Sequence, residues 1–283
     1  MKKGLILEGG AMRGMFTAGV MDVLMEKGIE FDGAVGVSAG AVFGCNYKSK
    51  QIGRVLRFNV RYCQDKRYSG LYSLVTDGNI FSKEFCYGEI PLKLDVFDFE
   101  TYEKNPMEFW LVCTDIETGE PCYHKYESFD DHGFDWFRAS SSIPLVSQIV
   151  EIDGKQYHDG SISDSIPVKF FESIGYDRNV AILTQPRDYR KTASDSNALI
   201  RLAYKKYPKL LETLENRMDF YNEQLEYVAE REKEGSLFVI APKAPLQIKR
   251  VEKDPEVIAK IYMEGREAAI EALNDLKTFL GLK

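Results

Sequence analysis

The amino-acid sequence predicts an α/β fold with a mostly parallel central sheet. Residues 4–7 form a short apolar run that a glycine-rich segment closes, and residues 15–27 carry apolar side chains at helical spacing. A second apolar run at residues 31–37 leads directly into residues 38–41, which open another helix. Strand, helix, strand and helix therefore follow one another within the first fifty residues. That order is typical of a parallel crossover unit.

The rest of the chain continues the alternation of strands and helices. Residues 51–105 lack clean periodicity, and we expect short helices and loops there, around the mouth of the active site. Strands are expected at residues 109–114, 122–126, 148–152, 155–158, 180–183 and 237–240, and helices at residues 135–141, 195–234 (interrupted near Pro208) and 255–279. Asp153 and Gly154 form a strong hairpin signal between two of these strands.

Composition and charge exclude several classes of function. The formal net charge of −7 argues against a nucleic-acid partner, because binding phosphates requires clustered Lys and Arg. The five cysteines lack metal-ligand spacing, and their odd number does not favour a disulfide framework. The apolar run near the N-terminus stops at Glu8, too early for a signal peptide, and no run is long enough to cross a membrane. We therefore expect a cytoplasmic protein with reduced thiols and no metal site.

The strongest chemical signal is a Gly-x-Ser-x-Gly motif at residues 36–40. At a sharp turn from a strand into a helix, Gly36 and Gly40 let the backbone fold tightly and leave the hydroxyl of Ser38 exposed. The helix that follows presents unpaired N–H groups, and its positive end favours an alkoxide or an oxyanion. The flanking strand and helix that this motif requires are both expected here, so the pattern predicts a nucleophilic serine.

A glycine-rich loop at residues 9–14 lies between the first strand and the first helix. A Walker loop would need a lysine followed by serine or threonine, whereas two apolar residues follow here. A dinucleotide-binding fingerprint would place glycine at position 11, where the chain has Ala11, and the second strand runs straight into the serine turn. The remaining interpretation is an oxyanion hole beside Ser38, with backbone donors from Gly9, Gly10 and Ala11.

The identity of the catalytic base depends on the histidines, which are His124, His132 and His158. In a hydrolase triad with the order serine, acid, histidine, only His158 could serve. His158 directly precedes Asp159 on an expected strand, so the two side chains should point to opposite faces and cannot both reach Ser38. A carboxylate base, Asp159, is the better candidate. The alternative is a structural role, in which Asp159 only caps a following helix.

These segments together resemble the patatin-like phospholipase family. Its marks are a D/E-G-G-G-x-R-G loop, a following G-x-S-x-G and a downstream D-G-G/A, which match residues 8–14, 36–40 and 159–161. Residues 139–144 are similar to the A-S-x-A-x-P stretch that precedes the catalytic aspartate in that family. The similarity covers about residues 4–183.

The resemblance implies a three-layer αβα sandwich, a Ser–Asp dyad, no metal or cofactor, and hydrolysis of lipid acyl esters. By this match Ser38 is the nucleophile and Asp159 the general base. The amides of Gly9, Gly10 and Ala11 form the oxyanion hole, and the supporting motif residues are Arg13, Gly14, Gly36, Gly40 and Gly160. Two positions depart from the pattern. Ala11 replaces the third glycine and would resist a positive φ, and Ser161 replaces Gly or Ala.

We therefore expect a serine-dependent lipid acyl hydrolase that acts through an acyl-enzyme intermediate on a lipid or other acyl ester, with contact to a membrane surface. Two alternatives remain: a non-catalytic lipid- or acyl-binding protein of the same fold, and a Ser-His-Asp α/β-hydrolase.

The chain is expected to form a single domain of residues 1–283, with the catalytic core at about 4–183 and a final strand and helix at 237–279. The helical segment 195–234 carries one apolar stripe at spacings of three and four, made of Leu210, Leu214, Met218, Tyr221, Leu225 and Val228. The stripe either packs on the domain's own core, covers the acyl-binding cleft as a lid, contacts a membrane, or joins a second copy in a homo-oligomer.

Overall fold

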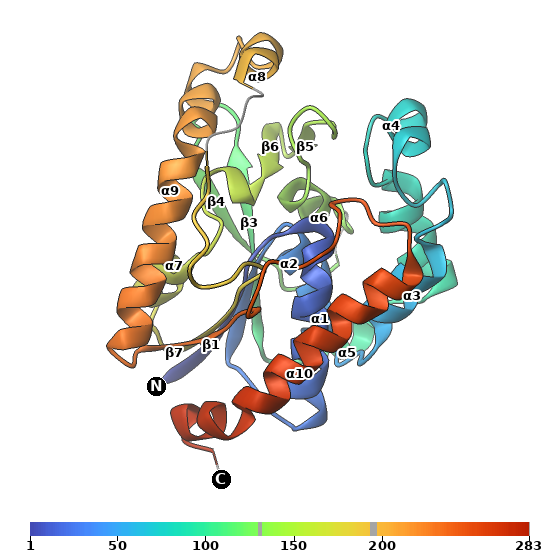
Figure 1. Cartoon of the computed structure of the whole chain (residues 1–283). Coiled ribbons are helices and arrows are strands. Elements are labelled where there is room, and N and C mark those ends of the chain that lie inside the picture. Colours follow the sequence, from blue (N-terminus) through green and yellow to red (C-terminus); the bar gives the residue numbers. More distant parts are fainter. Residues whose placement is uncertain (130–131, 193–196, 283) are drawn as a thin grey trace.

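The computed structural model describes residues 1–129, 132–192 and 197–282 (Figure 1). Eight strands form one sheet, in which hydrogen-bonded pairs link β5-β6-β3-β2-β1-β7-β8; β4 pairs with one edge of β3, and β2 and β6 share its other edge. Their bounds are β1 (Lys2–Leu7), β2 (Gly33–Val37), β3 (Glu108–Asp115), β4 (Pro121–Lys125), β5 (Val150–Ile152), β6 (Lys155–Asp159), β7 (Tyr176–Ile182) and β8 (Leu237–Ile240). The pairs among β1, β2, β3, β7 and β8 are parallel, whereas β4, β5 and β6 pair antiparallel. The prediction of a mostly parallel α/β sheet is confirmed.

The helices account for most of the remaining chain. They are α1 (Gly14–Glu26), α2 (Ala39–Lys48), α3 (Arg54–Tyr62), α4 (Leu71–Asp77), α5 (Phe99–Lys104), α6 (Asp135–Ser140), α7 (Val168–Ser173), α8 (Asn197–Ala203), α9 (Pro208–Lys233) and α10 (Pro255–Leu280), with short turns η1 (Ala11–Arg13) and η3 (Gly160–Ile162) and a wider helix η2 (Phe85–Leu94). In the described part of the chain, no helix has the length and apolar character needed to cross a membrane.

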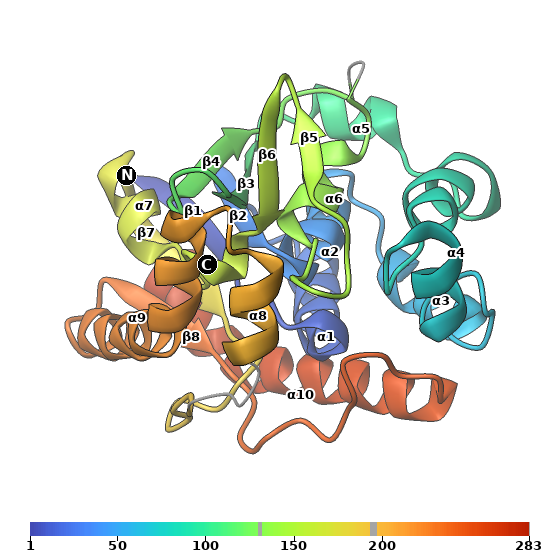
Figure 2. The same ribbon diagram turned by 90° about the horizontal axis from the view of Figure 1, so that it is seen from above.

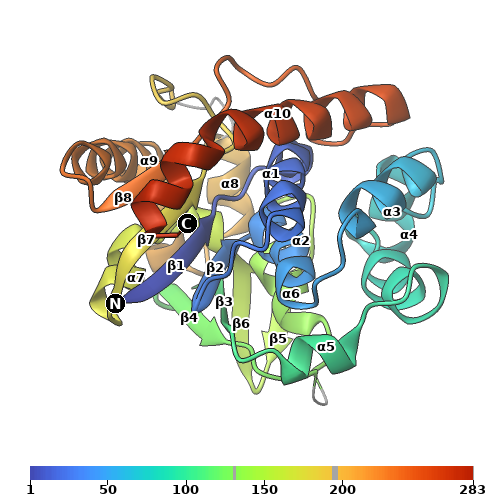
Figure 3. The same cartoon turned by 90° about the horizontal axis from the view of Figure 1, so that it is seen from below.

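The sheet is covered on both faces because its buried strands are apolar on both sides. In β1, Leu5 and Leu7 pack into a core with α1, α2 and α10, whereas Ile6 packs into a second core with α7 and α9. Figures 2 and 3 show these two groups of helices on opposite sides of the sheet. This arrangement confirms the predicted three-layer sandwich.

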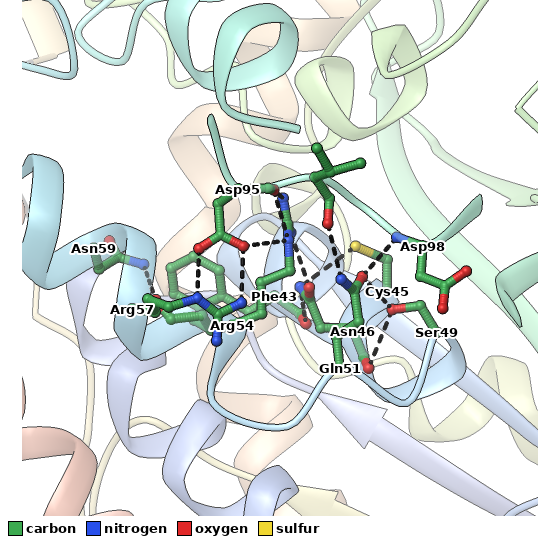
Figure 4. A network of polar contacts seen from close by, with 12 residues as sticks. Phe43, Cys45, Asn46, Ser49, Gln51, Arg54, Arg57, Asn59, Asp95 and Asp98 are labelled. Atoms are coloured by element: carbon green, nitrogen blue, oxygen red, sulfur yellow. Dashed lines mark hydrogen bonds and ion pairs between the residues drawn. The ribbon is translucent and has the colours of Figure 1, made fainter. Parts of the chain in front are cut away.

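The segment of short helices expected at residues 51–105 consists of α3, α4, η2 and α5. A buried polar network ties its two ends together (Figure 4). The buried Arg54 donates from Nε and Nη2 to the carbonyl oxygen of Asp95, at 3.0 and 2.6 Å, and from Nη1 to Oδ1 of Asn46 at 2.9 Å. Arg57 donates through Nε and Nη2 to the Asp95 carboxylate at 2.7 and 2.8 Å. The two-donor contacts fix the geometry between α3 and Asp95, and the single bond from Arg54 to Asn46 ties them to α2.

Besides shifts of one or two residues at other element boundaries, two elements differ from the sequence prediction. Helix α7 was not predicted, because six residues are too few to show a helical period, although Val168 and Phe171 both face the core. Strand β7 begins at Tyr176 rather than at residue 180, since the polar residues at its start pair with the first residues of β1. The helical segment expected at 195–234 forms α8 and α9, while Asp195 and Ser196 lie outside the described residues.

Candidate active site

Ser38 lies at the junction between β2 and α2. The strand ends at Val37, the helix begins at Ala39, and Ser38 takes φ +55° and ψ −122°, a conformation that residues with side chains rarely adopt. The turn is tight because backbones approach closely. A Cβ on Gly40 would lie 2.2 Å from the carbonyl oxygen of Leu7, so only glycine fits there. The sharp strand-to-helix turn predicted at Ser38 is therefore present.

Asp159 is the direct partner of Ser38. It is the last residue of β6, which pairs with β3, and its Oδ2 accepts a hydrogen bond from Ser38 Oγ at 2.7 Å. Its other oxygen, Oδ1, accepts the backbone N–H of Ser161 at 2.8 Å and so caps η3. Both residues are buried, and Ser38 is only 6% exposed, so the expectation of an exposed serine hydroxyl is wrong. One carboxylate thus performs the capping role and also contacts the serine.

Burial raises the pKa of Asp159 above the usual range of an aspartate. The hydrogen bonds from Ser38 and Ser161 and the positive charge of Arg217 oppose this rise. An aspartate with a raised pKa is a stronger base than an exposed one, and a pKa nearer to the working pH suits proton transfer.

The glycine-rich loop lies beside the serine, as the adjacent pairing of β1 and β2 requires. Ala11 takes a φ of +48°, so the alanine adopts the positive φ that it would resist. A Cβ on Gly10 would lie 2.6 Å from Oγ1 of Thr184, and a Cβ on Gly9 would lie 3.0 Å from the Cβ of Ser38. Among the described residues, no acceptor receives the N–H groups of Gly9, Gly10 or Ala11. These three N–H groups therefore have no acceptor within the described part of the protein.

Glu8, at the start of this loop, is buried, and both of its carboxylate oxygens accept hydrogen bonds within the protein. Its Oε2 accepts the N–H of Thr184 at 2.5 Å, and its Oε1 accepts the hydroxyl of Tyr221 at 2.6 Å. Burial raises the pKa of Glu8, and these hydrogen bonds oppose the rise. The sequence places Tyr221 in the apolar stripe, and its ring does pack in the core, but its hydroxyl anchors the loop through Glu8.

Ser140 is a site residue that sequence reasoning did not identify, although it lies in the matched stretch at residues 139–144. It accepts the backbone N–H of Ser38 at 3.0 Å and donates to the carbonyl oxygen of Val112 at 2.7 Å. The hydroxyl therefore bridges β2 and β3 at the point where the serine turn leaves the sheet.

His158 is held away from Ser38, as the alternation of side chains along β6 predicts. Its Nδ1 contacts the carbonyl oxygen of Ser142 at 2.8 Å, and its Nε2 contacts the hydroxyl of Tyr204 at 2.8 Å. Because a carbonyl can only accept, Nδ1 carries the proton and Nε2 accepts from Tyr204. Burial lowers the pKa of His158 to about 4, so the ring is neutral at physiological pH.

Two cavities of opposite character meet at Ser38, and Ala11 and Ile143 also line both. The apolar cavity lies between α2, α3, η2 and α6, with aromatic walls that include Phe43, Phe58 and Phe137. The basic cavity lies on the side of Asp159 and the glycine loop, and its walls carry Arg13, Lys191, Arg217 and Arg250. An elongated molecule with its reacting group at Ser38 would therefore place one half in each cavity.

Arg217 links α9 to the site, although nothing in the sequence singled it out. Its Nε donates to the carbonyl oxygen of Ser161 and its Nη2 to the Ser161 hydroxyl, both at 2.8 Å. The guanidinium therefore supports the turn that follows Asp159. Of the supporting motif residues, Gly14 begins α1, Gly36 lies in β2, and Gly160 packs so closely on β3 that a Cβ would lie 2.1 Å from the carbonyl oxygen of Val112.

Within the described residues, no group of three or more His, Cys, Asp or Glu side chains is arranged to hold a metal ion. The arrangement that is present consists of a hydroxyl on a buried carboxylate, with free backbone donors beside it. Such an arrangement can generate a serine alkoxide and stabilise an oxyanion.

Comparisons with known proteins match two parts of the chain. A family model described as "Patatin-like phospholipase" matches residues 5–171. A second model, described as "Domain of unknown function (DUF6363)", matches residues 207–281, which include α9, β8 and α10.

Relatives are found in bacteria and fungi. "Uncharacterized protein YjjU" of Escherichia coli (strain K12) is 28% identical over 257 residues, which are 86% of this chain and 69% of that protein. "Uncharacterized NTE family protein Mb1092c" of Mycobacterium bovis is 25% identical over 178 residues, 63% of this chain and 48% of that protein. "Lysophospholipase nte1" of Aspergillus terreus is 28% identical over 181 residues, 62% of this chain and 11% of that protein. The chain thus spans less than half the length of the last two relatives.

Among solved structures, VipD from Legionella pneumophila aligns with 97% of this chain and 67% of its own, with a TM-score of 0.45 and 13% sequence identity.

Proposed function

The chain belongs to the patatin-like phospholipase family, and we propose that it hydrolyses acyl esters of lipids through a Ser38–Asp159 dyad and an acyl-enzyme intermediate. The observation that carries this proposal is the 2.7 Å hydrogen bond from Ser38 Oγ to Asp159 Oδ2, made at a strained turn beside unpaired backbone donors. The name lysophospholipase, which the fungal relative carries, agrees with a lipid ester as the substrate.

In the first half of the reaction, Ser38 Oγ attacks the ester carbonyl carbon while its proton moves to Asp159 Oδ2. The carbonyl oxygen becomes an oxyanion that accepts hydrogen bonds from the N–H groups of Gly9, Gly10 and Ala11. The tetrahedral intermediate collapses, the bond to the alcohol breaks, and the alcohol takes the proton from Asp159.

In the second half, water attacks the carbonyl carbon of the acyl-enzyme and gives its proton to Asp159. Collapse of the second intermediate releases the fatty acid, and the proton returns to Ser38. Asp159 thus acts as base and then as acid in each half, and its raised pKa suits both tasks.

The two cavities support the orientation of the substrate. The apolar cavity suits a hydrocarbon chain because its walls are mostly aromatic and aliphatic. The basic cavity would then receive the alcohol half. Asp159 lines the basic cavity, so its proton is available on the side from which the alcohol leaves.

A lipid at a membrane surface is the natural source of such an ester, and the exposed apolar residues support contact with one. On α4, Leu71 and Val75 are 75% and 76% exposed, and on α8, Leu199 and Leu202 are 65% and 68% exposed. Figure 1 shows these two helices on either side of the β5–β6 hairpin, at one end of the molecule. Exposed apolar side chains gathered at one end are typical of a surface that meets lipid. The five cysteines are free thiols, which supports a reducing compartment such as the cytoplasm.

A Ser-His-Asp hydrolase and a non-catalytic binding protein are the alternatives. The hydrolase would need a histidine that hydrogen-bonds Ser38, whereas the two ring nitrogens of His158 contact Ser142 and Tyr204. A triple variant in which His124, His132 and His158 are all replaced by glutamine should keep measurable turnover. Loss of activity as complete as in Ser38→Ala, in a folded triple variant, would favour a triad.

Covalent labelling tests the enzyme against the binding protein. A fluorophosphonate ester should label the wild-type protein once, and peptide mass spectrometry should locate the adduct at Ser38. Absence of labelling in a folded protein that still binds fatty acid would instead favour a binding role.

A further inference from the structure

The cavity on the alcohol side of Ser38 carries more positive charge than the site chemistry requires. Its walls contain four basic side chains, from Arg13, Lys191, Arg217 and Arg250, and two carboxyl groups. The chain as a whole has a formal charge of −7, so this local excess of positive charge does not follow from composition.

The basic side chains of this cavity outnumber its carboxyl groups by four to two. In the part of the chain that the structure describes, none of the four forms an ion pair. Arg217 is held by the carbonyl and hydroxyl oxygens of Ser161, both neutral acceptors. The buried Nε of Arg13 has no hydrogen-bond partner among the described residues. A buried guanidinium donor without a partner is costly, unless a ligand supplies the acceptor.

The two carboxyl groups of the cavity are committed to other partners. Asp159 accepts from Ser38 and Ser161, and Glu8 accepts from Thr184 and Tyr221. Burial raises the pKa of both, and the positive charges of Arg13 near Glu8 and of Arg217 near Asp159 oppose the rise. With four basic side chains against two carboxyl groups, the cavity keeps an excess of positive charge.

Lys191 is fixed at this wall by its backbone. Its N–H donates to Oδ1 of Asn222 at 2.8 Å, and its carbonyl oxygen accepts from Nδ2 of the same residue at 3.1 Å. Its Nζ lies 4.9 Å from the ring centroid of Tyr221. Burial, together with the neighbouring guanidinium groups, lowers the pKa of Lys191 to about 7. Lys191 is thus held near other positive charges, and a bound anion would stabilise its charged form.

We propose that this basic cavity, lined by Arg13, Lys191, Arg217 and Arg250, binds a phosphate group on the alcohol half of the ester. The preferred substrate is then an acyl ester whose head group is an anionic phosphate that carries no cationic substituent. This inference rests on the proposed function, because the position of the alcohol half follows from attack by Ser38. Several guanidinium and ammonium donors around one cavity match the oxygens of a phosphate dianion. A choline or ethanolamine group would add a positive charge to a wall that is already positive.

Kinetic selectivity tests the proposal. Three lipids with the same acyl chain are compared: a monoacylglycerol, a monoacylglycerol phosphate and a monoacylglycerophosphocholine. We expect kcat/KM to be at least about tenfold higher for the phosphate monoester than for the other two, because one charge-assisted hydrogen bond contributes about that factor.

Charge-removing variants assign this selectivity to the cavity. Lys191→Gln and Arg250→Gln should each lower the selectivity for the phosphate monoester by about tenfold. Lys260→Gln, on the exposed face of α10, is the matched control and should leave the selectivity unchanged. Equal hydrolysis of all three lipids by the wild-type protein would overturn the anion site but leave the proposed function standing.

A binding measurement separates the two claims if hydrolysis is absent. Calorimetry with the Ser38→Ala protein should show the phosphate lipid binding more tightly than the uncharged one, and Arg250→Gln should remove the difference. Inorganic phosphate should bind weakly and compete with the lipid. If inorganic phosphate binds more tightly than the lipid, or binds without competing, the cavity is not a head-group site.

Discussion

Val37 and Asp159 pair with consecutive residues of β3: Val37 lies opposite Val112, and Asp159 lies opposite Cys113. Cys113 also pairs with Cys122 of β4, so β6 must occupy the other edge of β3, the edge that β2 occupies. Strands β2 and β6 therefore meet end to end along one edge of β3. Ser38, the residue after Val37, reaches Asp159 through the register of the sheet and not through long loops.

Ser140 should stabilise this meeting point. In Ser140→Ala the N–H of Ser38 and the carbonyl oxygen of Val112 lose their partner inside the protein, and we expect the free energy of unfolding to fall by about 1–3 kcal/mol. Because the Ser38 turn loses its support, kcat should fall as well. Urea denaturation and ester hydrolysis measure the two effects. Ser173→Ala, which removes an exposed hydroxyl on α7, should change neither; equal effects of the two substitutions would deny Ser140 a positioning role.

His158 should make the protein less stable in acid. Its pKa is about 4 in the folded protein and about 6.5 in the unfolded chain. Between these values only the unfolded chain takes up a proton, so stability falls as the pH falls from 6.5 to 4, by about 3 kcal/mol over the full window. Urea denaturation at several pH values should show that His158→Gln lacks this contribution. Parallel pH profiles of the two proteins would contradict the assignment.

The exposed leucines of α8 should contribute to binding lipid surfaces. Replacing both Leu199 and Leu202 with serine removes apolar surface that would otherwise transfer from water into the lipid. Co-sedimentation with liposomes should therefore fall roughly tenfold or more. Hydrolysis of a soluble ester should be preserved. The control is Ile270→Ser, on α10, where the side chain is 55% exposed. If Ile270→Ser weakens liposome binding as much as the α8 variant does, the α4–α8 end is not the membrane surface.

The apolar stripe of α9 is expected to act as core and not as a lid. Tyr221, Leu225 and Val228 pack against the sheet, and Leu214 packs in a small cluster around Ile162. Replacing Leu214 and Met218 with serine should lower Tm and reduce activity equally on aggregated lipid and on a soluble ester. Leu225→Ala provides the reference for a pure packing loss of about 2–5 kcal/mol. A selective loss on aggregated lipid, without a lower Tm, would favour the lid.

The sequence predicted the parts of the site that local pattern determines. The serine turn and the glycine loop each lie between a strand and a helix that are close together in the chain, so Ser38 and Gly9 to Ala11 could be located directly. Asp159 followed from the hairpin and from the alternation that directs His158 to the other face.

The remaining contacts are long-range, and no local pattern indicates them. Arg217 reaches Ser161 from α9, and Ser140 bridges two strands from the end of α6. A single arginine on an amphipathic helix and a serine in a run of serines look like surface and loop residues. The basic cavity also draws its four cations from separate segments of the chain, so only the folded structure brings them together.

The kinetics of the dyad variants test the central claim most directly. We predict that Ser38→Ala and Asp159→Asn each lower kcat/KM for a chromogenic short-chain ester by about 10³-fold or more, with the protein still folded by circular dichroism. The double variant should be hardly worse than either single one, because the two groups act as a unit. If folded Asp159→Asn retains more than about a tenth of the wild-type activity, Asp159 is not the base and the dyad mechanism is wrong.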